Sequence, residues 1–211
     1  MTILWWVRAA VAGPCDDPAV VAERSAAIQA IYDEGEAERA DRSAAATSVL
    51  ERDEARVAQM AKYDRAGELC TAADQWNAAW VMTQADKEST LIRAYEIAQL
   101  ASNGGHPNGN WLVAYTFDRK RVAGGFLQAY GTQTRKNERG QTCLIEVDPE
   151  VTDQTRADYG HPPIADAYRR VLDAAGFKTD EATLDRLERR GLSCKPLAIS
   201  KKAQRRVVAP D

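Results

Sequence analysis

The segment 111–133 holds the densest mixture of aromatic, amide, hydroxyl and charged side chains in the chain. Within it, Asp118 falls on the face of a predicted helix that also carries Trp111 and Tyr115, so its carboxylate points toward apolar neighbours. A carboxylate in such a place needs hydrogen-bonding partners or has a raised pKa. Two roles are therefore open for Asp118. It is a general acid or base, or it is structural and pairs with an arginine to fix the following strand against the helix. Its possible partners are Arg119, Arg121 and Arg156, and also the hydroxyls and amides of the strand that follows.

The polar segment after Gly124-Gly125 is expected to be a strand, residues 126–134. In a regular strand Gln128, Tyr130 and Thr132 face one way. Gly131 permits a bulge that could turn Gln133 to the same side. Such a face offers neutral donors and acceptors that suit sugars, peptides or amides, and it would equally serve as the solvated side of a hairpin.

The candidate binding cluster combines these two places with a short polar segment earlier in the chain. Its members are Asp118, Arg119, Gln128, Tyr130, Thr132, Gln133, Arg156, Asp86 and Gln84. No catalytic residue is assigned within it. A hydrolase that uses two carboxylates would pair Asp118 with Asp86 or Glu146.

Other arrangements that carry chemistry are missing from the sequence. His106 and His161 both stand beside prolines without triad spacing, so no nucleophile–histidine pair is indicated. No Gly-rich phosphate loop and no metal-ligand motif occurs, so the sequence predicts no cofactor and no metal.

The four cysteines, Cys15, Cys70, Cys143 and Cys194, form an even set without a CxxC pair. No histidine stands at ligand spacing, which argues against zinc. In an exported chain three connectivities are open. Antiparallel packing of the first two long helices would bring Cys15 and Cys70 together, so we favour Cys15–Cys70 with Cys143–Cys194. The alternative is four buried free thiols in a cytoplasmic protein.

The length of 211 residues suits one compact domain. Residues 17–192 are assigned to it, between an N-terminal segment 1–16 and a basic C-terminal tail 193–211. Segment 1–16 is either the remnant of a signal peptide, because Ala10-Val11-Ala12 has the form of a cleavage site, or an ordinary apolar N-terminus. No run approaches the roughly 20 apolar residues that span a bilayer. A formal net charge of -3 indicates no nucleic-acid partner.

Caps and periodicity predict a mainly α fold: a single compact helical domain with one small β-hairpin. Alanine, the best helix former, is the commonest residue, and aromatic residues make up only 7 %. The helices are expected to start at Pro18, at 43, after Thr71, at 111, after Asp148-Pro149, after Pro162-Pro163 and at 179. The helix after Thr71 is expected to continue to residue 98, because its apolar stripe continues that far. Two short strands, 126–134 and 142–147, form the hairpin.

Short motifs follow one another in a recognisable order from about residue 28 to 172. They are Asp33-Glu34 with Arg39, Asp53, Asp64-Arg65-Ala66-Gly67, Ala78-Ala79-Trp80-Val81, Gln84-Ala85-Asp86, Asp118-Arg119, Tyr130-Gly131-Thr132-Gln133, Asp148-Pro149, Arg156 and Pro162-Pro163-Ile164. In this order the chain resembles an uncharacterised bacterial helical domain family (domain-of-unknown-function family 6624), often found in exported or lipid-attached proteins.

The chain departs from that family at one place. Where the family usually reads Gln-His-Ala-Asp, this chain has Thr83-Gln84-Ala85-Asp86. Glutamine can hydrogen-bond but cannot cycle a proton. The resemblance therefore implies that the family does not rely on that histidine, or that this member has lost the chemistry.

Three functions are weighed. The first is a non-catalytic binding or accessory domain of the bacterial cell envelope, periplasmic or secreted in preference to cytoplasmic, with an unknown small-molecule or protein ligand. The alternative is a hydrolase acting on a carbohydrate or peptide, with Asp118 as general acid or base. The third is a helical adaptor that uses the charged face 34–56 for a protein partner. The oligomeric state is left open.

Overall fold

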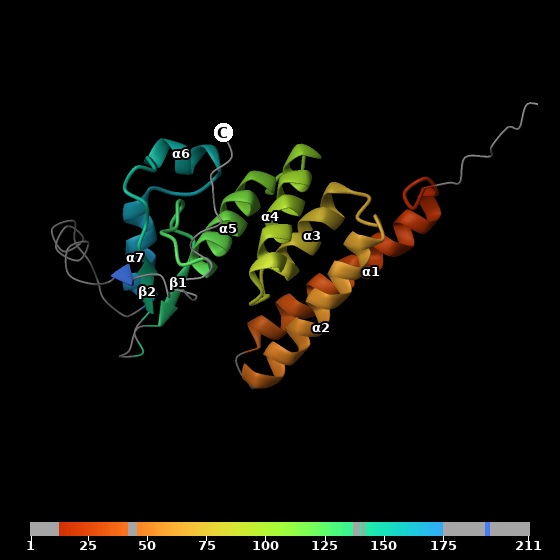
Figure 1. Ribbon diagram of the computed structural model, residues 1–211, viewed down its shortest axis with the longest axis horizontal. Helices are drawn as coiled ribbons and strands as arrows, with labels where there is room; N and C mark the ends of the chain where they lie inside the picture. The colour runs from red at the N-terminus through yellow and green to blue at the C-terminus, as the bar shows by residue number, and fades with distance from the viewer. Residues whose placement is uncertain (1–12, 42–45, 137–139, 141, 175–192, 195–211) are drawn as a thin grey trace, which may run out of the picture.

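The computed structural model describes residues 13–41, 46–136, 140, 142–174 and 193–194 (Figure 1). Within these residues it is mainly helical with one hairpin, as predicted. The elements in chain order are α1 (Pro18–Ala40), α2 (Ala46–Arg65), α3 (Ala72–Met82), α4 (Glu88–Asn103), α5 (Gly109–Ala123), β1 (Thr134–Lys136), β2 (Thr142–Ile145), α6 (Asp153–Asp158), α7 (Ile164–Ala174) and β3 (Ser193–Cys194). The predicted last helix, 179–190, and the segments 1–12 and 195–211 lie outside the described residues.

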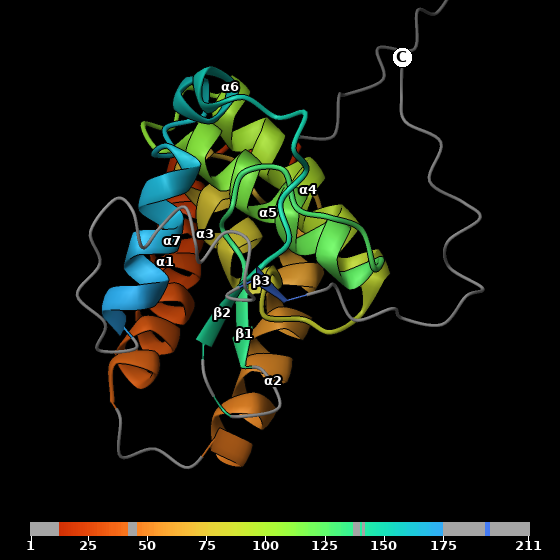
Figure 2. The ribbon, with the colours of Figure 1, turned by 90° about the vertical axis from the view of Figure 1, so that its left-hand side faces the viewer.

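The helices follow one another across the molecule (Figure 1). The long α1–α2 pair lies at one end, α3, α4 and α5 pack side by side in the middle, and the hairpin with α7 lies at the other end. Figure 2, seen from that end, shows α7 and the hairpin facing the viewer with α6 above them. The chain therefore places residues from its middle and its last third on the same side of α5.

Two helix starts follow from local caps. Asp17 accepts hydrogen bonds from the backbone amides of Ala19 and Val20 at the start of α1. Thr71 and Asp74 form a reciprocal capping box at the start of α3. Both starts were predicted, because each needs only residues within one turn.

The predicted continuous helix from Thr71 to residue 98 is wrong, because the chain turns between α3 and α4. The Thr83 hydroxyl donates to the carbonyl of Trp80, at 2.6 Å. The Thr83 carbonyl accepts from Arg119 Nε of α5, at 3.1 Å. In a continuing helix that carbonyl would have accepted from the amide of Lys87, so the arginine takes the place of the next helical hydrogen bond.

The main core lies between α1, α2, α3, α4 and α5. Its fully buried side chains are aliphatic and small, which lets the helices approach closely. They include Ile28, Met60, Ala78, Val81, Ala94, Ile97, Ala98 and Leu112. A smaller apolar cluster of Leu144, Ala167 and Val171 joins β2 to α7. The hairpin end of the molecule therefore has its own packing layer.

The charged stretch 34–56 is partly directed inward. Arg56 is only 5 % exposed, and it pairs with Asp53 at 3.0 Å and with Glu38 at 2.6 Å. Asp53 also accepts from Arg39 at 3.0 Å. The sequence predicted a solvated face here, but these charges join α1 to α2, which leaves less of this face for a protein partner.

The Cys15–Cys70 disulfide is present and confirms the predicted pairing. It ties the segment before α1 to the loop between α2 and α3, as expected for two antiparallel helices. Cys143 lies on β2, and β3, which includes Cys194, runs parallel to it. The side chain of Cys194 lies outside the described part of the structure, so the Cys143–Cys194 pairing stays a prediction. No helix in the described ranges is both long and apolar enough to cross a bilayer.

Candidate functional site

Asp118 holds the loop that follows α5. Its side chain is fully buried. Its carboxylate accepts hydrogen bonds from the backbone amides of Ala129 at 2.6 Å, Tyr130 at 3.0 Å and Thr132 at 3.1 Å, and from the Thr132 hydroxyl at 2.9 Å. In the described part of the chain no arginine bonds to it. The expected Asp–Arg pair is therefore wrong. The amides and the hydroxyl of the following segment, which were also expected as partners, do bind Asp118 and fix this segment to the helix.

Burial and hydrogen bonding act on Asp118 in opposite directions. Removal from water raises the pKa of its carboxyl group above the ordinary value, and the three amides and the Thr132 hydroxyl partly offset that rise. Every partner is a donor, which suits an ionised carboxylate. The carboxylate has no exposed surface, so a substrate in the pocket cannot contact it directly.

The predicted strand 126–134 is wrong over most of its length, because residues 128–133 wrap around the carboxylate. Successive amides of a regular strand point in opposite directions, so a strand could not aim three of them at one carboxylate. The Gln128 side chain closes the loop. It donates to the carbonyls of Gln133 and Ile145 and accepts from the amide of Gln133. Only Thr134–Lys136 continues as β1.

Gly131 allows this loop to lie against α7. Its φ of +74° belongs to the left-handed region, and a Cβ there would lie 2.8 Å from Ile164 Cδ1. Gly140 has a similar φ of +75°, with no atom within 4 Å of its Cβ position. The two glycines therefore share a left-handed φ but differ in the space around it.

Gly131→Ala is expected to lower the free energy of unfolding by about 2 kcal/mol, because the end of the Ile164 side chain must move in addition to the left-handed strain. Gly140→Ala, the matched control, is expected to cost only the strain, about 1 kcal/mol. Urea denaturation of both variants gives the comparison. Equal losses would show that the loop does not need the close approach to α7.

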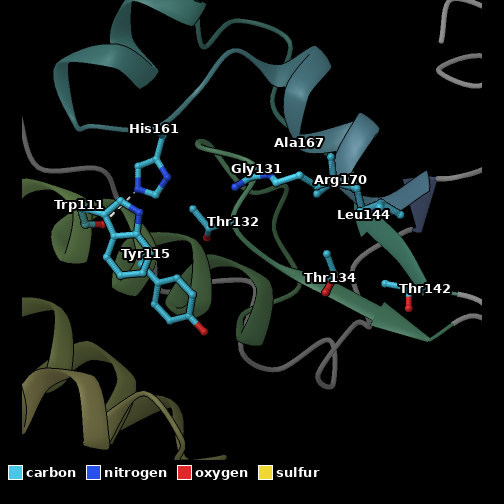
Figure 3. A pocket seen from close by; sticks show the side chains of 11 residues that line it. Trp111, Tyr115, Gly131, Thr132, Thr134, Thr142, Leu144, His161, Ala167 and Arg170 are labelled. Carbon is cyan, nitrogen blue, oxygen red and sulfur yellow. Dashed lines mark hydrogen bonds between the residues drawn. The ribbon is translucent and has the colours of Figure 1, made fainter. Parts of the chain in front are cut away.

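A pocket of about 270 Å³ opens beside this loop (Figure 3). One side is aromatic and comes from Trp111 and Tyr115 of α5 and from His161, just before α7. The loop and the hairpin contribute Gly131, Leu144 and three hydroxyl side chains, Thr132, Thr134 and Thr142. Helix α7 contributes Ala167, Arg170 and Val171. Asp118 is not among the lining residues but holds Thr132 in place from behind.

The aromatic side of the pocket is the end of a longer row of rings. Trp111 lies 5.3 Å from Tyr115 and 5.5 Å from His161, with interplanar angles of 15° and 21°. Trp80 lies 5.8 Å from Trp111, and Trp76 lies 5.9 Å from Trp80. Such contacts hold rings in fixed orientations, so the wall of the pocket is rigid.

His161 was set aside in the sequence for lack of triad spacing, but the structure places it in the wall of the pocket. It is 6 % exposed, and its Nε2 lies 3.1 Å from the carbonyl oxygen of Trp111. Because a carbonyl only accepts, Nε2 carries the proton in this contact. Burial is the main cause that lowers the pKa of His161, and the charge of Arg170 lowers it further, while the bond to Trp111 opposes both.

The lowered pKa of His161 predicts a loss of stability in acid. The unfolded chain binds this proton at the ordinary pKa of 6.5, and the folded chain binds it only at a lower pH. Stability is therefore present above pH 6.5 and is lost as the pH falls through the folded pKa. The difference in unfolding free energy between the protein and its His161→Gln variant should shrink from pH 7.5 to pH 5. His106, whose pKa is also lowered, is common to both proteins. A difference that does not change with pH would contradict this assignment.

The remaining predicted site residues bond elsewhere. Arg119 points to the turn between α3 and α4, where Asp86 is 95 % exposed and lies 4.0 Å from it. Gln84 is at the same turn and donates to the Thr83 hydroxyl. Arg156 is buried on α6 and donates to the carbonyl of Val151 and to Asp153.

The structure thus brings together Asp118, Gln128, Thr132 and Gln133, with Tyr130 at the edge of the cluster. The Tyr130 ring lies 6.0 Å from that of His161. Arg119, Gln84 and Asp86 form a separate group, and Arg156 a third. In the described ranges no three His, Cys, Asp or Glu side chains group in a way that could hold a metal ion.

Comparison with protein-family models, with curated proteins and with solved structures finds no match. The resemblance to the uncharacterised bacterial helical family therefore stays a prediction. Function has to be inferred from the geometry of the pocket.

Proposed function

We propose that this chain is a non-catalytic binding domain of the bacterial cell envelope, and that its ligand is a saccharide bound in the pocket between α5 and α7. The observation that carries the proposal is the rigid wall of Trp111, Tyr115 and His161 opposite the threonine hydroxyls of the loop and hairpin. Aromatic faces pack against the C–H faces of sugar rings, and hydroxyl groups exchange hydrogen bonds with sugar hydroxyls. A volume of about 270 Å³ suits one ring with its substituents.

The side chains of the pocket favour binding over hydrolysis. Glycoside hydrolysis needs two carboxyl groups that flank the bond to be cleaved. The lining residues of this pocket include neither Asp nor Glu, and Asp118 accepts hydrogen bonds on both oxygens in the core. The alternative of a hydrolase that uses Asp118 thus has little support.

The Cys15–Cys70 disulfide supports the assignment to the envelope. Structural disulfides persist in the oxidising compartments outside the bacterial cytoplasm and are rare within it. Cys15 is exposed, and the bond joins two parts of the chain 55 residues apart. Such a bond would be open to cytoplasmic reductants.

A panel of neutral and acidic oligosaccharides tests the proposal by isothermal titration calorimetry. The protein is expected to bind at least one member, and Trp111→Ala is expected to weaken that binding by at least about 10-fold, since it removes the centre of the aromatic wall. Trp76→Ala is the matched control, because Trp76 belongs to the same row of rings but does not line the pocket. Failure of the whole panel, or equal binding by both variants, would refute the proposal.

A further inference from the structure

The side chains that line the pocket carry a positive charge and no negative charge. Arg170 is the one formally charged side chain among its lining residues, and none of them is acidic. The carboxylate of Asp118, which lies behind the loop, is occupied by amides and a hydroxyl. A ligand in this space therefore meets a positive charge that no lining side chain neutralises.

Arg170 differs from its neighbours on this side of the molecule. Arg169 pairs with Asp166, Arg156 with Asp153, and Arg121 with Asp148. Within the described residues Arg170 has neither an ion pair nor a hydrogen bond. Its side chain instead extends into the pocket toward His161 (Figure 3). A guanidinium group offers five N–H donors in a planar fork, and here the fork is left open.

Several neutral polar groups of the pocket already have hydrogen-bond partners within the protein. The Thr132 hydroxyl already donates to Asp118 and accepts from Gln133. The Thr142 hydroxyl accepts from Lys136 Nζ at 2.7 Å, which places a second positive charge, an ammonium group, at the hairpin rim of the pocket. His161 uses Nε2–H on the Trp111 carbonyl. The strongest unsatisfied donor is therefore Arg170.

We infer that the saccharide carries an anionic group, a carboxylate or a phosphate, and that Arg170 binds it while the ring packs against Trp111 and Tyr115. This inference rests on the proposed function and narrows its ligand to acidic sugars. Arginine recognises carboxylate and phosphate by two parallel N–H···O bonds. Because both groups present two or more oxygens to such a fork, the geometry fits the chemistry that they share.

The test compares oligogalacturonate with a neutral galactose oligosaccharide of the same length, which differs in having a hydroxymethyl group in place of the carboxylate. Galactose 6-phosphate and monomeric galacturonate, as a second pair, separate phosphate from carboxylate. The protein is expected to bind at least one acidic sugar about 10-fold or more tightly than its neutral counterpart at low salt. Arg170→Gln is expected to abolish that preference.

Arg169→Gln is the matched control. It removes a charge from the adjacent position of α7, where Arg169 already pairs with Asp166, and it should keep the preference for acidic sugars. A preference that survives in Arg170→Gln, or one that Arg169→Gln removes equally, would overturn the assignment of Arg170. Arg170 is exposed, so its variant is expected to fold.

The outcomes also separate this inference from the function on which it rests. Equal binding of acidic and neutral sugars, with loss in Trp111→Ala, would keep the saccharide site and refute its preference for an anion. Binding of benzoate that depends on Arg170, with no binding of any sugar, would keep an anion site and refute the saccharide. No binding of sugars or benzoate would refute both.

Discussion

Asp118→Asn is expected to lower the free energy of unfolding by about 3 kcal/mol or more, the largest effect of any single polar substitution that we predict. The carboxylate serves three backbone amides and one hydroxyl. Asparagine keeps one oxygen and turns an NH₂ group toward donors, so at least one buried N–H loses its acceptor. Each such group costs about 1–3 kcal/mol, and the lost charge-assisted bonds add to that.

The measurement is urea denaturation followed by circular dichroism, with Asp86→Asn as the control. Asp86 undergoes the same chemical change at 95 % exposure, so its variant should stay within about 0.5 kcal/mol of the parent protein. Asp118→Asn should also weaken ligand binding, because it releases the loop that carries Gly131 and Thr132. A change below about 1 kcal/mol would mean that the loop holds its shape without the carboxylate.

Removal of the Cys15–Cys70 disulfide is expected to cost about 4 kcal/mol. The bond closes a loop with a sequence separation of 55 residues, and the chain-entropy model assigns a cost of that size to a loop of this length. The Arg24 side chain also joins this corner through the carbonyl of Pro14 and the carboxylate of Glu68. Without the disulfide, these Arg24 contacts should still hold the segment before α1 against the loop between α2 and α3, although less firmly.

Serine variants allow the disulfide to be tested against simple loss of packing. Cys15→Ser, Cys70→Ser and the double variant each lack the bond, so all three should show the same loss in urea denaturation. If the two single losses differed widely or added in the double variant, the side chains rather than the cross-link would carry the stability.

The elements that were predictable from sequence are those that short-range contacts determine. Asp17 and the Thr71–Asp74 box specify helix starts within one turn. The α3–α4 turn was not predictable in this way, because it depends on Arg119 reaching the carbonyl of Thr83 from 36 residues away. The apolar stripe runs through both helices and carries no sign of the interruption.

The same distinction between short-range and long-range contacts applies to the candidate site. Asp118 and Thr132 were chosen from their types and from their closeness in sequence, and they do meet. The pocket itself joins Trp111 to His161 and Arg170, which are 50 and more residues further on. No local pattern indicates that meeting. The proline after His161 biases that residue toward an extended conformation, and this is the only signal that could have drawn attention to it.

The row of rings that ends at the pocket also makes the protein its own optical probe. The ring centroids of Trp76 and Trp80, and those of Trp80 and Trp111, lie less than 6 Å apart. At such distances excitation energy passes between the indoles before emission. Excitation is therefore shared among the three rings, and a ligand that contacts Trp111 is expected to change their combined emission. Protonated imidazole quenches indole emission by contact, so titration of His161 beside Trp111 and of His106 beside Trp76 will both register in this signal. Occupancy of the pocket can thus be followed without a label.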